Sequence, residues 1–291
     1  MKDHLDLKAY AKINLGLDVI RKREDGYHEV RMIMQTVNLY DRIEMDRTED
    51  GVIRTETNLP FVPDGEGNLA WRAAKLLLDE KGIKDGVTIK IRKFIPVAAG
   101  MAGGSTDAAA VLVGVNRMFD LGFTKKELME RGVKLGADIP YCLMGGTALS
   151  EGIGEILTKL PDVPKAKLVI AKPDLDVSTK FVYENLHADS LQYHPDIDGM
   201  VASIEKGDLC GITDRMENVL ETVTCKHYPV IEQMKGILKE HGAVNALMSG
   251  SGPTVFGIFT DDQNAKEAYE AMQEAGLARQ LFLTGFADGR G

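Results

Sequence analysis

A glycine-rich stretch, PVAAGMAGGSTDAAA at 96–110, has the residue types of a phosphate-binding turn. Gly100, Gly103 and Gly104 lie between a strand-like run and a helix-like run. Glycine lets backbone N–H groups approach an anion, and a helix start adds unpaired donors and the positive end of a dipole. A plain tight turn is the alternative, but it does not need three glycines followed by a serine and a threonine. The stretch therefore predicts a phosphate site.

Two well-known phosphate loops do not fit this stretch. A Walker A loop ends in Gly-Lys-Ser/Thr, and no lysine lies between Pro96 and Lys125. A dinucleotide loop needs GxGxxG, which the order Gly-Met-Ala-Gly at 100–103 breaks. A Rossmann domain also usually opens with its loop, whereas this one comes far into the chain.

The elements that must position the turn are readable on both sides of it. Residues 87–92 alternate between apolar and polar, which predicts a half-buried strand, and residues 105–119 predict a helix. Another helix is expected over 68–81, with Asn68 as its cap and an apolar stripe along one face. Thr124 and Glu127 have the spacing of a capping box for a third helix.

The first strand carries two polar residues that could do chemistry. Residues 6–19 alternate over a long stretch, so Lys12 and Asn14 lie on the face opposite the apolar one. Such a face is either a solvated surface or the floor of a site. Asp138, between a helix end and Pro140, is likewise either a turn residue or a chemical group.

An aromatic residue and a histidine follow the next turn. Asp25-Gly26 is a hairpin signal, and Tyr27 and His28 come directly after it. They either pack on the rim of the strands or form a stacking platform with an imidazole donor and acceptor, which suits a flat heterocycle.

The order of elements favours an α+β fold, with strands first and mixed elements later. The prolines at 161 and 164 mark the expected boundary, which gives domains at 1–160 and 161–291. In the second domain we expect a helix near 177–186, a glycine-containing loop at 245–252 and a strand at 254–259.

The composition limits the class of protein. The formal net charge of −9 over 291 residues argues against nucleic acid as a partner. No apolar run is long enough to cross a bilayer and the N-terminus is charged, so we expect no membrane association and a cytoplasmic protein. The three cysteines do not have the spacing of a metal site. An acidic protein that binds a nucleotide needs a local dipole at the site rather than a broad basic patch.

Four motifs in this order resemble those of the GHMP kinase family: AKINL, PVAAGMAGGSTDAA, GADIPYC and MSGSGPTVFG. The resemblance covers nearly the whole chain. It implies an N-terminal domain like domain 2 of ribosomal protein S5, which would bind the nucleotide, and a ferredoxin-like α/β C-terminal domain, which would bind the substrate. Gly26-Tyr27-His28 further resembles a branch of the family that serves the non-mevalonate isoprenoid route. ATP would there phosphorylate the tertiary 2-hydroxyl of a methylerythritol linked to cytidine diphosphate.

The resemblance implies a role for each site residue. Asp138 would accept the proton of the hydroxyl, and Lys12 would stabilise the developing charge. Backbone groups of the turn would hold the phosphates of ATP, with Mg²⁺ as the expected metal and its ligands unassigned; Asn68 and Leu69 would lie by the adenosine. The turn residues are Pro96, Val97, Ala98, Ala99, Gly100, Met101, Ala102, Gly103, Gly104, Ser105 and Thr106.

Several departures and choices stay open. Ala102 replaces a family glycine, and Asp107 is interpreted as bracing the turn rather than as a metal ligand. In the implied cytidine pocket His28 would hydrogen-bond the base and Tyr27 would stack on it, while Thr179 and either Phe181 or Tyr183 would come from the second domain. Asn14 is expected near the erythritol hydroxyls.

Two other functions compete with this one. A GHMP kinase for another small alcohol, such as homoserine or mevalonate, has no reason to carry Gly26-Tyr27-His28. A nucleotide-binding module without catalysis has no reason to keep both Lys12 and Asp138. The small-molecule substrate is the expected partner, and the sequence leaves a homodimer open.

Overall fold

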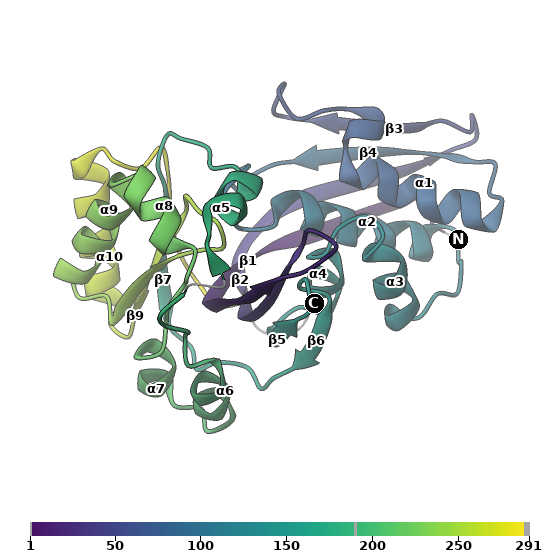
Figure 1. Ribbon diagram of the computed structural model, residues 1–291. Helices are drawn as coiled ribbons and strands as arrows, with labels where there is room; N and C mark the ends of the chain where they lie inside the picture. Colours follow the sequence, from purple (N-terminus) through teal and green to yellow (C-terminus); the bar gives the residue numbers. More distant parts are fainter. Residues whose placement is uncertain (1, 189–190, 288–291) are drawn as a thin grey trace. The chain divides into compact units, whose positions relative to one another are not determined.

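The computed structural model describes residues 2–188 and 191–287 and contains two compact units (Figure 1). Unit 1 takes in Met1–Ala11, Leu39–Val97 and Ala102–Met144. Unit 2 takes in Lys12–Asn38, Ala98–Met101 and Gly145–Gly291. The two longest strands, β1 (His4–Lys22) and β2 (His28–Thr48), each contribute residues to both units.

Unit 1 contains a sheet in the order β3-β4-β2 with helices against it (Figure 1). Strand β3 (Ile53–Thr57) runs parallel to β4 (Gly86–Arg92), and β4 runs antiparallel to β2 with Arg42 opposite Arg92. The short helix η1 spans Gly65–Gly67. The α-helices are α1 (Leu69–Lys81), α2 (Gly103–Met118), α3 (Lys125–Gly132) and α4 (Ile139–Met144).

Apolar side chains of these strands and helices form one core. Ile43 of β2, Ile89 of β4, Leu77 of α1 and Leu112 of α2 are all fully buried in it. Burial of apolar area at about 25 cal/mol per Å² is the main stabilising contribution of such a core. The core therefore fixes α2, whose first turn carries the glycines.

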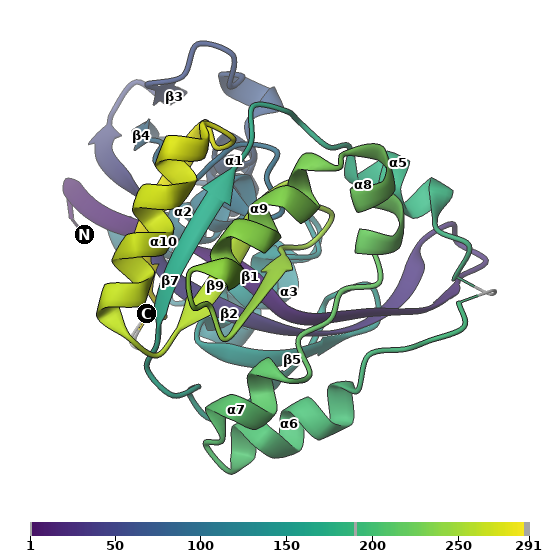
Figure 2. The ribbon, with the colours of Figure 1, turned by 90° about the vertical axis from the view of Figure 1, so that its left-hand side faces the viewer.

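Unit 2 contains an antiparallel sheet in the order β10-β7-β9-β8. Helices α9 and α10 lie across this sheet (Figure 2). Strand β5 pairs with β2 and with β6, and so continues the sheet of β3, β4 and β2. The strands are β5 (Thr147–Glu151), β6 (Ile156–Lys159), β7 (Lys167–Lys172), β8 (Asn245–Met248), β9 (Val255–Phe259) and β10 (Gln280–Gly285).

The helices of unit 2 follow β7 in the chain. They are α5 (Thr179–Asn185), α6 (Ile197–Glu205), α7 (Leu209–Thr213), α8 (Glu221–His227), α9 (Val230–Glu240) and α10 (Asp262–Ala275). Over residues 2–188 and 191–287, no helix is both long enough and apolar enough to cross a membrane.

The structure confirms the α+β class and most predicted elements. Asn68 caps α1, and Thr124 with Glu127 forms the capping box of α3. The glycine-turn helix begins at Gly103 rather than two residues later. Strands β6 and β8 were not predicted. The residues of β8 were included instead in the predicted glycine-containing loop at 245–252.

The polar face of β1 is not a solvated surface. The sequence left this face open as either a solvated surface or the floor of a site, and the structure excludes only the first. Lys12 is 5% exposed and Asn14 is fully buried, so both faces are covered from Ala11 to Val19. Alternation in sequence gives the direction of a side chain, but it does not show what covers it.

Candidate active site

The first turn of α2 offers backbone donors. Ala102 precedes the helix with a φ of 57°, and no side chain caps the helix start. The N–H of Thr106 donates to the carbonyl of Ala102, whereas the N–H groups of the first three residues have no acceptor inside the helix. This arrangement leaves donors and a positive dipole end for an anion.

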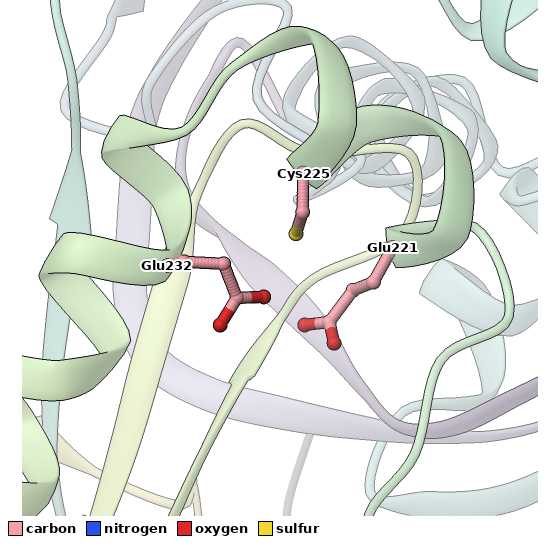
Figure 3. Close-up of side chains that lie close together, drawn as sticks. All are labelled: Glu221, Cys225 and Glu232. Carbon is pink, nitrogen blue, oxygen red and sulfur yellow. The ribbon is translucent and has the colours of Figure 1, made fainter.

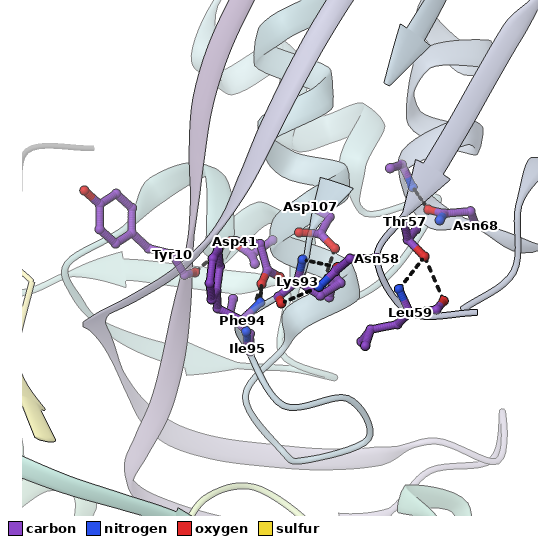
Figure 4. Close-up of polar contacts among 12 residues, drawn as sticks. Tyr10, Asp41, Thr57, Asn58, Leu59, Asn68, Lys93, Phe94, Ile95 and Asp107 are labelled. Atoms are coloured by element: carbon purple, nitrogen blue, oxygen red, sulfur yellow. Dashed lines mark hydrogen bonds and ion pairs between the residues drawn. The ribbon is translucent and has the colours of Figure 1, made fainter. Parts of the chain in front are cut away.

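Three buried charges, on Asp41, Lys93 and Asp107, lie close together beside the start of α2 (Figure 4). Lys93 donates to Asp41 at 2.5 Å and to Asp107 at 2.6 Å, and all three side chains are at most 6% exposed. Asp41 also accepts the N–H groups of Phe94 and Ile95. Asp107 therefore braces the turn, as its position suggested.

Burial raises the pKa of the Asp107 carboxyl well above its usual range, against the opposing effect of Lys93. Its Oδ1 has no hydrogen-bond partner among the described residues. The attraction of the two carboxylates raises the pKa of Lys93, although burial acts in the other direction. Two carboxylates thus share one ammonium.

The residues expected near the adenosine also lie beside the turn. Asn68 accepts the N–H of Ala70 and donates to the carbonyl of Pro63. A Cβ placed on Gly104 would lie 3.7 Å from Leu69 Cδ1. Unit 1 therefore brings the start of α1 and the start of α2 together.

The hydroxyls of the turn differ in their contacts. Thr106 Oγ1 donates to the carbonyl of Tyr10 at 2.7 Å, so it anchors α2 to β1. Ser105 is half-buried and lies near Gly136, in the segment before Asp138. Ser105 is therefore the better-placed hydroxyl for a ligand.

Asp138 directly precedes α4 and is half-buried. Its carbonyl accepts the N–H of Cys142. Its carboxylate has no hydrogen-bond or ion-pair partner among residues 2–188 and 191–287. Asp138 belongs to unit 1 and Lys12 to unit 2, so their pairing stays a prediction.

Unit 2 places Lys12 and Asn14 in a buried contact. Lys12 Nζ donates to Asn14 Oδ1 at 2.7 Å, and the amide of Asn14 lies 3.2 Å from Met32 Sδ. The backbone N–H of Lys12 donates to the carbonyl of Met101. An ammonium held by a neutral amide keeps its charge available for a negative group.

The turn around Gly100 packs against the loop of residues 249–252. Ser249 Oγ donates to the carbonyl of Gly100 at 3.0 Å, and a Cβ built on Gly100 would overlap the carbonyl of Ser249. Gly100 also has a φ of 71°. Both this backbone conformation and the lack of space for a Cβ therefore require glycine here. A Cβ on Gly250 would lie 3.5 Å from Asn14 Oδ1.

The other turn residues differ in exposure. Pro96, Ala99 and Met101 are buried, and Val97 is half-buried. Ala98 is exposed and has a φ of 51°. A non-glycine residue in this region is uncommon and marks a constrained backbone.

The aromatic candidates separate into two pairs within unit 2. The ring of Tyr183 lies 5.1 Å from that of His28, whereas Phe181 contacts His227 edge-to-face. Thr179 Oγ1 lies 2.8 Å from Ser251 Oγ, so α5 also contacts the 249–252 loop. Tyr27 is 60% exposed. The structure therefore favours Tyr183 over Phe181 as the aromatic partner of His28.

A cluster of Glu221, Cys225 and Glu232 has ligand atoms close enough together for a metal (Figure 3). Lys235 Nζ, however, lies 2.8 Å from Glu221 and 2.9 Å from Glu232, so an ammonium already balances these carboxylates. Burial raises the pKa of the Cys225 thiol, and this disfavours the thiolate that a metal needs. We therefore interpret the cluster as structural ion pairs around Lys235 rather than as a metal site.

Sequence reasoning did not identify Asp41, Lys93 or Asn218. Lys93 directly follows β4 and Asp41 takes the place of an apolar residue in the alternation of β2, so each is a charge beside buried positions. That signal is weak, because charged residues at strand ends are common on protein surfaces.

Comparison with known proteins identifies the family. The model of the GHMP kinase N-terminal domain matches residues 68–146, and that of the GHMP kinase C-terminal domain matches residues 200–278. The chain belongs to the GHMP kinase family. The N-terminal match includes both the glycine turn and Asp138.

Full-length relatives of this GHMP kinase are similar over nearly the whole chain. A protein of Lachnospira eligens named 4-diphosphocytidyl-2-C-methyl-D-erythritol kinase is 54% identical over 97% of this chain and 98% of its own length. A protein of the same name from Lachnoclostridium phytofermentans is also 54% identical, over 99% of each chain.

Solved structures agree with this family. A crystal structure of a 4-(cytidine 5'-diphospho)-2C-methyl-D-erythritol kinase has a TM-score of 0.83 at 31% identity, over 98% of this chain and 100% of that one. A homoserine kinase of Cytophaga hutchinsonii has a TM-score of 0.77 at 22% identity, over 98% of this chain and 94% of that one. The second likeness shows the GHMP kinase fold alone.

Proposed function

We propose that this GHMP kinase transfers the γ-phosphate of ATP to the 2-hydroxyl of 4-diphosphocytidyl-2-C-methyl-D-erythritol. The products are the 2-phosphate and ADP, and the reaction belongs to the isoprenoid route without mevalonate. The names of the full-length relatives support this substrate. The observation that carries the proposal is the His28–Tyr183 ring pair, because a base-reading site needs an aromatic face and an imidazole.

We assign the nucleotide to the glycine turn and to Asn68 and Leu69. The uncapped start of α2 supports this assignment, because its backbone donors suit phosphate oxygens. Ser105 is the hydroxyl that we expect at the phosphates. It also fits Mg²⁺, which takes oxygen ligands, and the metal would neutralise charge on the phosphates of ATP.

We assign proton transfer to Asp138 and charge stabilisation to Lys12. The carboxylate of Asp138 has no partner among the described residues, so it can accept a hydrogen bond from the substrate hydroxyl and then take its proton. The ammonium of Lys12 donates to the neutral amide of Asn14. We expect this ammonium to stabilise the oxygen of the substrate hydroxyl as negative charge develops on it.

We assign substrate recognition to unit 2. Asn14 is expected at the erythritol hydroxyls, and His28 at the polar edge of the cytosine. Tyr27 and Tyr183 are expected at its faces, with Thr179 nearby. The high exposure of Tyr27 is consistent with a ring that gains its contacts from a ligand.

A coupled assay of ADP release tests the proposal. We expect turnover with the cytidyl-methylerythritol substrate and little with homoserine or mevalonate. Asp138→Asn keeps the size of the side chain, so it should retain nucleotide binding and lose turnover by about 10²–10⁴-fold. Turnover of homoserine or mevalonate in preference would assign another branch of the family, and wild-type turnover in Asp138→Asn would remove the proton-transfer role.

A further inference from the structure

Asn218 makes a set of buried hydrogen bonds to the strand end and loop that contact Gly100. It is 5% exposed, and its Nδ2 donates to the carbonyls of Met248 and Gly250, at 2.8 Å each. Its Oδ1 accepts the N–H of Leu220 at 3.0 Å. Both amide hydrogens are therefore engaged, which leaves no donor for a ligand.

The backbone beside Asn218 is fixed to β1. The N–H of Leu17 donates to the carbonyl of Glu217 at 2.9 Å, and the N–H of Val219 donates to the carbonyl of Leu17 at 3.0 Å. Strand β1 also carries Lys12 and Asn14. The position of the Asn218 amide is thus set by the strand that supplies the proposed catalytic lysine.

A second buried side chain holds the same strand end. Glu221 Oε1 accepts the N–H of Met248 at 2.8 Å, and Oε2 accepts from Lys235 at 2.8 Å. Asn218 and Glu221 thus engage both the carbonyl and the N–H of Met248, directly before the loop of residues 249–252.

That loop in turn sets the turn at Gly100. Ser249 donates to the Gly100 carbonyl, and no space for a Cβ remains between Gly100 and Ser249. Such a close contact transmits a shift in one segment to the other, because packed backbone has little room to absorb it.

We propose that Asn218 is a positioning residue for nucleotide binding, which holds the 249–252 loop so that the Gly100 turn keeps the backbone form that receives the phosphates. The inference rests on the proposed assignment of ATP to this turn. Asn218 does not touch the nucleotide in this scheme, so its loss should weaken binding of ATP and leave recognition of the cytidine group unchanged.

Asn218→Asp is the direct test. The aspartate has the same shape and can still accept the N–H of Leu220, but it turns two donated hydrogen bonds into contacts between oxygens. We expect KM for ATP, and Kd for a non-hydrolysable ATP analogue, to rise by about tenfold or more. We expect KM for the second substrate to change less than about twofold.

Asn245→Asp is the matched control. Asn245 of β8 also donates its amide, to the carbonyl of Thr213 at 2.7 Å, and accepts the next N–H, from Ala246. Within the described part of the chain, its side chain makes no hydrogen bond to the 249–252 loop. We expect a similar loss of thermal stability in this variant with an unchanged affinity for the ATP analogue.

Two results would overturn the positioning role: wild-type analogue affinity in Asn218→Asp, or an equal loss in Asn245→Asp. If Asn218→Asp does not fold, Asn218→Ala removes the donors without placing an acceptor there, and the same difference in analogue affinity is expected in smaller measure. Analogue binding is measured without the second substrate, so an error in the proposed substrate leaves this comparison intact.

Discussion

Lys93 shows what a single buried charge does in this molecule. Its ammonium lies between Asp41 and Asp107, and Asp41 is further held by two backbone N–H groups. Removal of the ammonium would leave two buried carboxylates without a counter-charge. Removal of the Asp107 charge would instead relieve an excess of negative charge, because its pKa is already raised by burial.

We therefore expect two substitutions at this cluster to lower the free energy of unfolding by very different amounts. Lys93→Met should lower the free energy of unfolding by about 3–5 kcal/mol, the usual cost of breaking a buried ion pair from one side. Asp107→Asn should cost much less, since Lys93 keeps Asp41 as its partner. Denaturant unfolding measures both, with Lys75→Met at the exposed Lys75–Asp79 pair as the control, expected within about 1 kcal/mol of wild type. Equal losses at Lys93 and Asp107 would contradict this account.

Residue types and spacing predicted much of the site, but not its buried supports. The glycine turn, the Asn68 cap and the Asp107 brace were readable, because each rests on neighbours in sequence. The Asp41–Lys93 pair joins positions 52 residues apart, and the Asn218 amide reaches a strand 30 residues away. Only the folded chain brings such groups together, so no local pattern reveals them.

At the scale of elements, the contact between the Gly100 turn and the 249–252 loop is the most constrained packing near the site. Gly100 combines a positive φ with a carbonyl of Ser249 where its side chain would be. The predicted strands and helices were confirmed because their periodicity is local. The sequence could not decide whether the polar face of β1 is solvated or buried, because residues distant in the sequence cover it.

Gly100→Ala should therefore lower the free energy of unfolding by more than the cost of a left-handed backbone alone. An alanine in this region costs about 1–2 kcal/mol, and the overlap with Ser249 forces the turn to move as well. Gly82, with a φ of 63° and nothing near its missing Cβ, is the matched control. We expect Gly82→Ala to lose stability only, and Gly100→Ala also to weaken binding of an ATP analogue by about tenfold or more. Unchanged analogue binding in Gly100→Ala would contradict the role of this packing.

For the whole molecule, the order of the chain matters as much as its packing. Unit 2 gathers residues from three separate parts of the sequence, including Lys12–Asn38 and Ala98–Met101. Sequence composition placed a boundary near residue 160, and the two matched family segments lie on either side of it. That boundary stays a prediction, since a change in composition reports a linker and not which segments pack together.

The interleaved units predict how fragments behave. A fragment of residues 161–291 lacks the partners of Val219, Ser249 and Thr284, which are Leu17, Gly100 and Asn38. We expect it to melt at lower temperature and with less cooperativity than the full chain, and to recover both when it is co-expressed with residues 1–160. Calorimetry of the purified fragment and of the co-purified pair checks this. A fragment that melts like the intact protein would show that these contacts do not contribute to its stability.

Ala98 and Ala102, with φ angles of 51° and 57°, have a consequence for chemists who would copy the anion-binding turn. A short synthetic peptide of this stretch made from ordinary amino acids would abandon the bend, because nothing would hold its two alanines on the disfavoured side of φ. D-alanine prefers that side by mirror symmetry. A mimic with the D-enantiomer at these two positions should retain the bend without the rest of the protein.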